Sequence, residues 1–296
     1  MKKLIVFSLI VLFAQACEKT VVEYSDDPKI VVANPISDIM VEEGRVTTTI
    51  DISSVFEVVG TKQAQVLKAV QSIQNTNLVT AIIADNILTL TAKIGISGSS
   101  EVVIRGEWGG YVAYETFIFS VNAIQAGTAL NMAISHFQDA DYANAENYFR
   151  IVLSKSNEDL KPEAYMGLGF SQMRNNNAFD AYQSFQSSLT LRSDNNDALA
   201  GMSLLEYATK QNYPAAISYG QSVLASNDNY IFSYDTSINK FDLLVNIALS
   251  QYMLQLWEDC INTIRDIDPA YNMDTQQDEF RTKLFQKLEE LVLTHS

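Results

Sequence analysis

The sequence predicts a fold in two parts, a β-sandwich followed by an all-α array of helical repeats. Three observations support this prediction. Up to about residue 123, short β-branched runs alternate apolar and polar residues between turn residues, as in half-buried strands. From Gln125 onward, the apolar residues recur with the 3.6-residue period of a helix. Within that second region one sequence motif recurs about every 35 residues, a period typical of helical-hairpin repeats.

Length and composition agree with two packed domains. The chain has 296 residues, of which 47% are hydrophobic and 10% aromatic, which is enough for well-filled cores. The chain has 20 basic and 35 acidic residues, which gives a formal charge of −15. An acidic surface repels phosphate groups, so nucleic acid is excluded as a partner and anionic lipid is disfavoured.

The first 16 residues have the pattern of an export signal. Lys2 and Lys3 precede an apolar run at 4–13, and Ala14-Gln15-Ala16 follows as a small-residue cleavage site. The run is shorter than the ~20 residues that cross a bilayer. We therefore expect a signal peptide at 1–16. Its removal leaves 18 basic and 35 acidic residues, a formal charge of −17.

One of the two cysteines directly follows this site. The segment Phe13-Ala14-Gln15-Ala16-Cys17 resembles a bacterial lipoprotein signal. That resemblance implies that Cys17 becomes the acylated first residue and anchors the chain, while residues 17–33 form a polar tether. The alternative is ordinary cleavage that leaves Cys17 unmodified. The other cysteine, Cys260, has no partner except Cys17, so no disulfide framework is expected.

Residues 34–123 form the predicted sandwich. Short strands are separated by Gly, Asn and Ser, and Phe117, Phe119 and Val121 share one strand face. Seven short strands in about ninety residues suit a sandwich. The expected strands are 39–41, 46–52, 66–73, 78–83, 87–93, 101–106 and 114–121.

The phrases "NPISDIMVEEG", "TIDISSVFEVVG" and "ETFIFSVN" resemble immunoglobulin/cadherin-like repeats of bacterial surface proteins. The resemblance implies an immunoglobulin-like sandwich at 34–123. In those repeats an Asp-rich turn that binds calcium often follows, whereas here only Glu57 supplies a carboxylate. We therefore expect no metal site.

Residues 124–272 contain the repeated phrase, as "DYANAENYFRIVL", "AFDAYQSFQSSL" and "NYPAAISYGQSVL", with a weaker fourth copy, "LWEDCINTI". These phrases resemble tetratricopeptide repeats, in which small residues twelve apart mark the crossing of two helices. Gly169 with Ala181 follows that spacing, whereas the third repeat places Leu204 opposite Ala216. The resemblance implies an all-α solenoid of about four repeats. Residues 273–296 are expected to form a capping helix.

The sequence contains few residues whose spacing would suit a catalytic site. The only histidines, His136 and His295, lie far apart in the sequence, and no phosphate loop or paired-cysteine metal spacing occurs. Cys260 stands where the repeats place a small buried residue. The sequence therefore predicts a protein that is not an enzyme and that carries no cofactor.

The resemblance to tetratricopeptide repeats also indicates a partner surface, the concave face of the solenoid. The positions that line it are almost all apolar here, which favours a partner such as an amphipathic helix. The alternative is that the chain fills its own groove with the C-terminal helix or the β-domain. The groove residues are Leu130, Ile134, Phe137, Met166, Phe170, Met173, Leu205, Val245, Leu249 and Tyr252.

A second candidate surface is the predicted hairpin "EWGGYVAYE". Its Gly109-Gly110 turn places Trp108 beside Tyr111, and with Tyr114 they would stack on a glycan or another protein. The alternative is that the aromatics only stabilise the hairpin. The same two interpretations apply to the aromatics of an insertion at 227–239.

Together these features predict a lipid-anchored envelope lipoprotein of a Gram-negative bacterium. Its placement in the outer membrane is implied by the resemblance alone. The expected function is an adaptor or scaffold that binds another envelope protein through the apolar groove. The alternative is glycan binding through the aromatics of the β-domain. Neither the partner nor the membrane leaflet follows from the sequence.

Overall fold

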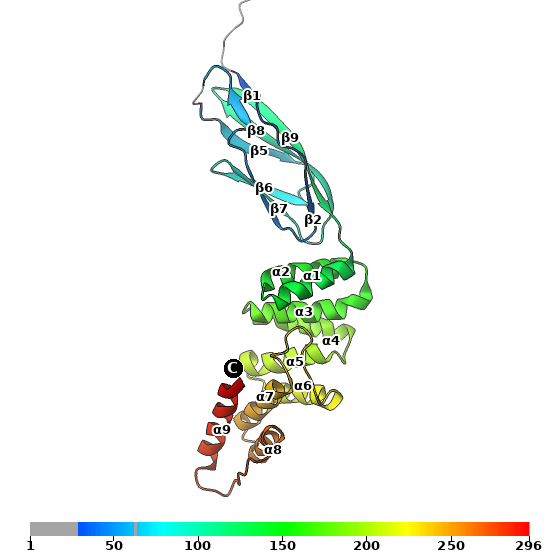
Figure 1. Ribbon diagram of the computed structural model, residues 1–296, viewed down its shortest axis with the longest axis vertical. Helices are drawn as coiled ribbons and strands as arrows, with labels where there is room; N and C mark the ends of the chain where they lie inside the picture. The colour runs from blue at the N-terminus through cyan, green and yellow to red at the C-terminus, as the bar shows by residue number, and fades with distance from the viewer. Residues whose placement is uncertain (1–28, 62–63, 296) are drawn as a thin grey trace, which may run out of the picture.

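The computed structural model describes residues 29–61 and 64–295. The predicted signal peptide, Cys17 and most of the predicted tether lie outside the described residues. Figure 1 shows an elongated molecule, with the strands at one end and a stack of helices at the other.

The described residues before Ala123 form nine strands in three sheets, two strands more than expected. A four-stranded sheet has the order β2-β9-β8-β5, and a three-stranded sheet has the order β3-β7-β6. The two additional strands, β1 and β4, pair with each other. The bounds are β1 Ile30–Val32, β2 Ile39–Glu42, β3 Thr47–Asp51, β4 Phe56–Val58, β5 Leu67–Ile73, β6 Val79–Ala84, β7 Ile87–Ala92, β8 Gly98–Trp108 and β9 Tyr111–Asn122.

One apolar core joins the sheets. Phe117 and Phe119 of β9 point into it together with Leu88 and Leu90 of β7, and all four are buried. The alternation along these strands puts every second side chain in the core. The pattern that predicted the strands is therefore the pattern that fills the core.

The helices that follow form four antiparallel pairs, α1–α2, α3–α4, α5–α6 and α7–α8, stacked in chain order (Figure 1). A ninth helix, α9, lies within the segment 273–296, where a capping helix was expected. The bounds are α1 Ala126–Gln138, α2 Tyr142–Ser154, α3 Lys161–Arg174, α4 Ala178–Leu191, α5 Asn196–Leu205, α6 Tyr213–Ser226, α7 Lys240–Met253, α8 Trp257–Ile267 and α9 Phe280–His295.

The small residues allow the paired helices to cross closely. Gly169 of α3 lies against the ring of Phe185, and a Cβ added at Gly169 would lie 2.6 Å from Phe185 Cε1. Ala181 and Cys260 occupy corresponding positions in α4 and α8, and both are fully buried. A side chain larger than these would force the helices apart.

The third repeat corrects the expected register. Ser203, rather than Leu204, faces Ala216, and its hydroxyl donates to the Ala216 carbonyl oxygen at 2.7 Å. The two residues are thirteen apart because Glu206–Lys210 forms a π-helical turn after α5. A π turn accommodates one extra residue, so the small residue lies one position earlier than the twelve-residue spacing predicts.

The β-region and the first helical pair are joined by a buried ion pair. Glu43 follows β2, and its Oε2 accepts from Lys155 Nζ at 2.5 Å and from the Ile124 amide at 2.9 Å. Next to it Gly44 has φ of 100°, and an added Cβ would lie 2.5 Å from the ring of Tyr148. The junction therefore consists of direct contacts between the two regions.

Candidate functional site

The predicted groove residues lie on α1, α3, α5 and α7, but they do not line an open groove. Six of the ten side chains are buried within this chain, and the other four are partly buried. These side chains therefore do not form an open apolar surface in the structure. The chain fills its own concave face, in part with the C-terminal helix, as the alternative expected, and in part with a segment that neither interpretation named. The buried six are Leu130, Phe137, Met166, Phe170, Leu205 and Val245, and the partly buried four are Ile134, Met173, Leu249 and Tyr252.

The segment between α6 and α7 fills the first half of the concave face. We call residues 227–239 the insert. Its Phe232 stacks on Phe170 of α3 with ring centroids 4.1 Å apart, and it meets Phe137 of α1 edge to face at 5.9 Å. Tyr234 packs against Phe137 from the same segment, at 6.0 Å. The insert thus places aromatic rings where the sequence predicted a partner's side chains.

Polar contacts hold the insert in this position. The Tyr234 hydroxyl donates to Glu163 Oε1 at 2.7 Å, and Asp235 forms an ion pair with Arg174 of α3. The Phe232 amide donates to the Ile238 carbonyl oxygen at 2.8 Å, which closes the loop on itself. Hydrogen bonds and an ion pair therefore hold the insert in place beside its packed aromatic rings.

Burial also changes the acidity of the groups under the insert. It raises the pKa of Asp197, and the nearby Glu163 adds to that effect, while hydrogen bonding by Ser233 partly offsets it. Burial likewise raises the pKa of the Tyr234 hydroxyl, and its bond to Glu163 raises it further. The Tyr234 hydroxyl therefore stays neutral, and the rings of Tyr234 and Phe232 meet the concave face without a charge of their own.

The last helix covers the other half of the concave face. Leu284, Leu288 and Leu291 of α9 share one apolar cluster with Val245 of α7. The ring of Tyr252 lies 5.7 Å from that of Phe285. α9 therefore lies against α7, and it covers the predicted groove residues of the last repeat.

One cleft of about 250 Å³ remains between α5, α7 and α9. Leu204, Val245 and Leu249 line it, with Leu291 of α9 on the other side. Leu205 was predicted to line the concave face, but it is buried in the core. Leu204 lines the concave face instead. The extra residue of the π turn explains this shift by one position.

The second predicted surface is only partly assembled. Trp108 and Tyr111 are directly paired across the β8–β9 hairpin, as expected. Tyr114 is paired with Arg105, and it is three residues beyond Tyr111, so it lies on the opposite face of the sheet. The three aromatics therefore do not form one stacking platform.

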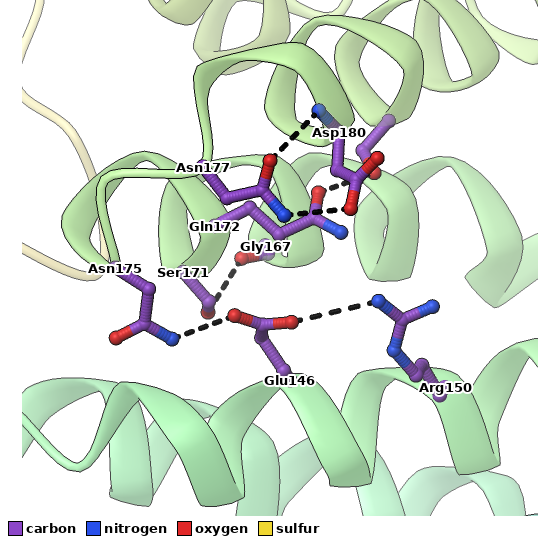
Figure 2. Close-up of polar contacts among 9 residues, drawn as sticks. Glu146, Arg150, Gly167, Ser171, Gln172, Asn175, Asn177 and Asp180 are labelled. Atoms are coloured by element: carbon purple, nitrogen blue, oxygen red, sulfur yellow. Dashed lines mark hydrogen bonds and ion pairs between the residues drawn. The ribbon is translucent and has the colours of Figure 1, made fainter.

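Polar side chains between the repeats are already engaged with one another. Figure 2 shows Glu146 of α2 between Arg150 and the Asn175 side chain, and Asn175 Nδ2 donates to its Oε1 at 2.6 Å. Gln172 Oε1 of α3 accepts from the Ser184 hydroxyl of α4 at 2.7 Å. These groups connect neighbouring helices, so we assign them a structural role.

The nucleophilic and basic residues have structural surroundings too. His136 lies 3.1 Å from Asp141 and stacks on Tyr148, at the junction of α1 and α2. Burial raises the pKa of the Cys260 thiol to about 12. Within 29–61 and 64–295, no three His, Cys, Asp or Glu side chains are grouped so that they could hold a metal ion. The helices in these ranges are all too short or too polar to cross a membrane.

Comparison with known proteins gives a fold likeness only. No family model and no curated protein matches the chain. Among solved structures, a crystal structure of MamA is similar at 14% identity and TM-score 0.39, over 57% of this chain and 81% of that one. A tetratricopeptide repeat protein from Parabacteroides merdae is similar at 16% identity and TM-score 0.41, over 57% and 60% of the two chains.

A third similar structure is MamA from Desulfovibrio magneticus RS-1, at 16% identity and TM-score 0.43, over 57% of this chain and 96% of that one. Nothing about the activity of these proteins is carried over. The helical-repeat architecture rests on the stacked helix pairs of this chain.

Proposed function

We propose that the chain is an envelope lipoprotein that acts as a protein-binding scaffold, anchored through Cys17 and holding its partner at the far end of the helical array. The lipoprotein-like segment 13–17 supports the anchor. The repeated helix pairs support a binding role, since such arrays present extended surfaces to other proteins. The acidic charge of the chain argues against nucleic acid as the partner.

One observation carries the location of the partner. Large apolar side chains are exposed around the turn between α7 and α8 and on α9, where the stack of repeats ends (Figure 1). We call this surface the end patch. Tyr252 lies at its centre, with ring centroids 5.3 Å from Trp257 and 5.7 Å from Phe285. The end patch consists of the exposed Met253, Leu254, Leu256 and Phe285 around the partly buried rings of Tyr252 and Trp257.

The end patch fits a helical partner. Leu256 is 42% exposed and Phe285 is 43% exposed, and the Phe285 ring lies beside the partly buried ring of Tyr252. In a stacked array the next helical hairpin would pack at this end, so apolar side chains here offer the surface that a further helix buries. The concave face cannot serve in this way, because the insert and α9 occupy it.

The test compares three forms of the chain. Wild type, Leu256→Glu and Leu191→Glu are crosslinked in intact envelopes, and the captured protein is then purified and titrated against each form. Leu191 is a matched control, because it is exposed on α4, away from the end patch. We expect Leu256→Glu to weaken binding about tenfold or more, because a carboxylate must be buried at the contact. Equal affinities for all three forms would contradict the proposal.

A further inference from the structure

The end of the β-region that faces away from the helices is the end at which the tether emerges. β9 leads directly into α1, so the opposite end of β9, with the Gly109–Gly110 turn, points away from the helices. Lys29, the first described residue, precedes β1, which lies at that same end in Figure 1. The part of the β-region nearest to Cys17 along the chain is thus also the part farthest from the end patch.

That end carries exposed apolar and aromatic side chains, which we call the tip. Leu67 of β5 and Val112 of β9 lie on either side of Glu107, and Leu67 is 70% exposed. Tyr111 and Tyr114 are 46% and 51% exposed. The tip consists of the exposed Leu67, Tyr111, Val112 and Tyr114, together with the partly buried Trp108, which packs against the core of the β-region.

The tip is electrically neutral in a strongly acidic chain. The run 108–114 contains no carboxylate, ammonium or guanidinium group. Glu107 next to it is paired with Arg105 at 2.7 Å. Tryptophan and tyrosine with an apolar body and a polar edge concentrate at the head-group level of bilayers. The tip therefore has the composition of a surface that contacts a neutral lipid interface.

The length of chain before Lys29 brings the tip within reach of the bilayer. Eleven residues lie between Cys17 and Lys29, and the twelve steps from one to the other span roughly 40 Å at most in a fully extended chain. With Cys17 acylated, the tip is the first part of the β-region that meets the membrane. A weak contact suffices there, because the tether keeps the tip at a high effective concentration near the lipid.

We propose that the tip rests in the head-group region of the bilayer that holds Cys17, an inference that rests on the lipid anchor of the proposed function. The β-region then stands on the membrane with its strands directed away from it. Its longest strand, β9, has 12 residues and spans roughly 40 Å. The contact thus holds the helical array, and the end patch with it, at a fixed distance from the membrane.

The two tryptophans make a matched pair of probes for this contact, because Trp108 is in the tip and Trp257 is in the end patch. The chain from residue 17 onward is coupled through the Cys17 thiol to a maleimide lipid in phosphatidylcholine vesicles. Cys260 does not compete, since it is fully buried. Trp257→Phe isolates the emission of Trp108, and Trp108→Phe isolates that of Trp257.

We expect brominated phosphatidylcholine to reduce Trp108 emission about twofold, as it does for residues at the interface, and to leave Trp257 emission unchanged. Tyr111→Glu with Val112→Glu should abolish the quenching while melting at the temperature of wild type, because both side chains are exposed. Unquenched Trp108 in coupled protein would overturn the proposal. A shift of Trp108 emission caused by soluble envelope polysaccharide, without quenching by lipid, would instead assign the tip to glycan and overturn it as well.

A separate measurement tests the anchor on which the inference rests. Cells expressing wild type or Cys17→Ala are labelled with radioactive palmitate. Label on wild type alone supports the anchor, and absence of label would overturn the anchor and the inference for the cell, whatever the vesicles show. Labelled wild type with unquenched Trp108 would overturn the tip contact alone.

Discussion

Asp197 is a residue whose pKa reflects its burial beneath the insert that closes the concave face. It lies partly buried at the start of α5, and its Oδ2 accepts from the Ser233 hydroxyl of the insert at 3.5 Å. Burial, its main influence, raises its pKa above the ordinary value of 3.8. Ionised Asp197 is therefore less favourable in the folded chain than in the unfolded chain, which lowers the free energy of unfolding at neutral pH.

Because the pKa of Asp197 differs between the folded and the unfolded chain, the stability of the protein should depend on pH. Stability should be lost as pH rises through the raised pKa of Asp197 and regained as pH falls through it. We expect Asp197→Asn to melt at a higher temperature than wild type at about pH 7.5, and the difference to shrink as pH falls through the raised pKa of Asp197, because the wild-type carboxyl then becomes neutral. Thermal melting of both forms across that pH range is the measurement. A difference that stays constant with pH would contradict the assignment.

Leu204 and Leu205 show how far the twelve-residue spacing of the repeats predicts the position of individual side chains. The twelve-residue spacing correctly marked Gly169, Ala181 and Cys260 as close-packed positions. It failed in the third repeat because it assumes an unbroken α-helix, whereas the π turn after α5 adds one residue. No local pattern in the sequence marks that turn, so the register shift could be found only from the structure.

The insert is the element that decides what the helical array can bind. The sequence predicts an insertion at 227–239 whose aromatics either bind a ligand or pack within the chain. Its destination could not be predicted, because Phe232 contacts Phe137 and Phe170, which are distant in the sequence and come together only when the repeats stack. The helix α9 was expected as a cap, and the C-terminal helix was one of the two segments expected to fill the groove; its packing against α7 agrees with that alternative.

The insert should also be a stabilising element. Phe232 is fully buried, whereas its neighbour Ile231 is 58% exposed. We expect Phe232→Ala to lower the free energy of unfolding by about 3–5 kcal/mol, the usual cost of emptying a buried phenylalanine site. Ile231→Ala is the control and should cost less than about 0.5 kcal/mol. Urea unfolding followed by far-ultraviolet circular dichroism reports the helices, and similar midpoints for the two variants would show that the insert is not part of the core.

Strand prediction succeeded where alternation was long and failed where strands were short. β9 and β7 bury every second side chain, and both were expected. β1 and β4 have three residues each, too few for a period of two to be distinguished from a loop. They pair with each other from distant parts of the chain, so only the folded structure brings them together.

At the scale of the whole molecule, the β-region and the helical array lie end to end. Glu43, bonded to Lys155 and to the Ile124 amide, ties the two parts together. The tip is at one end and the end patch is at the other (Figure 1). This arrangement suits a scaffold whose membrane contact and partner contact are separated by the length of the protein.

The measurement that tests this account most directly is photo-crosslinking in intact envelopes. A benzophenone-bearing amino acid is placed at Leu256 in the end patch, and in a second protein at Ser233, which is exposed on the insert over the concave face. The account predicts a crosslinked partner from Leu256 and none from Ser233, because the insert already closes the concave face. A partner crosslinked from Ser233 and not from Leu256 would contradict it, and would place binding over the concave face.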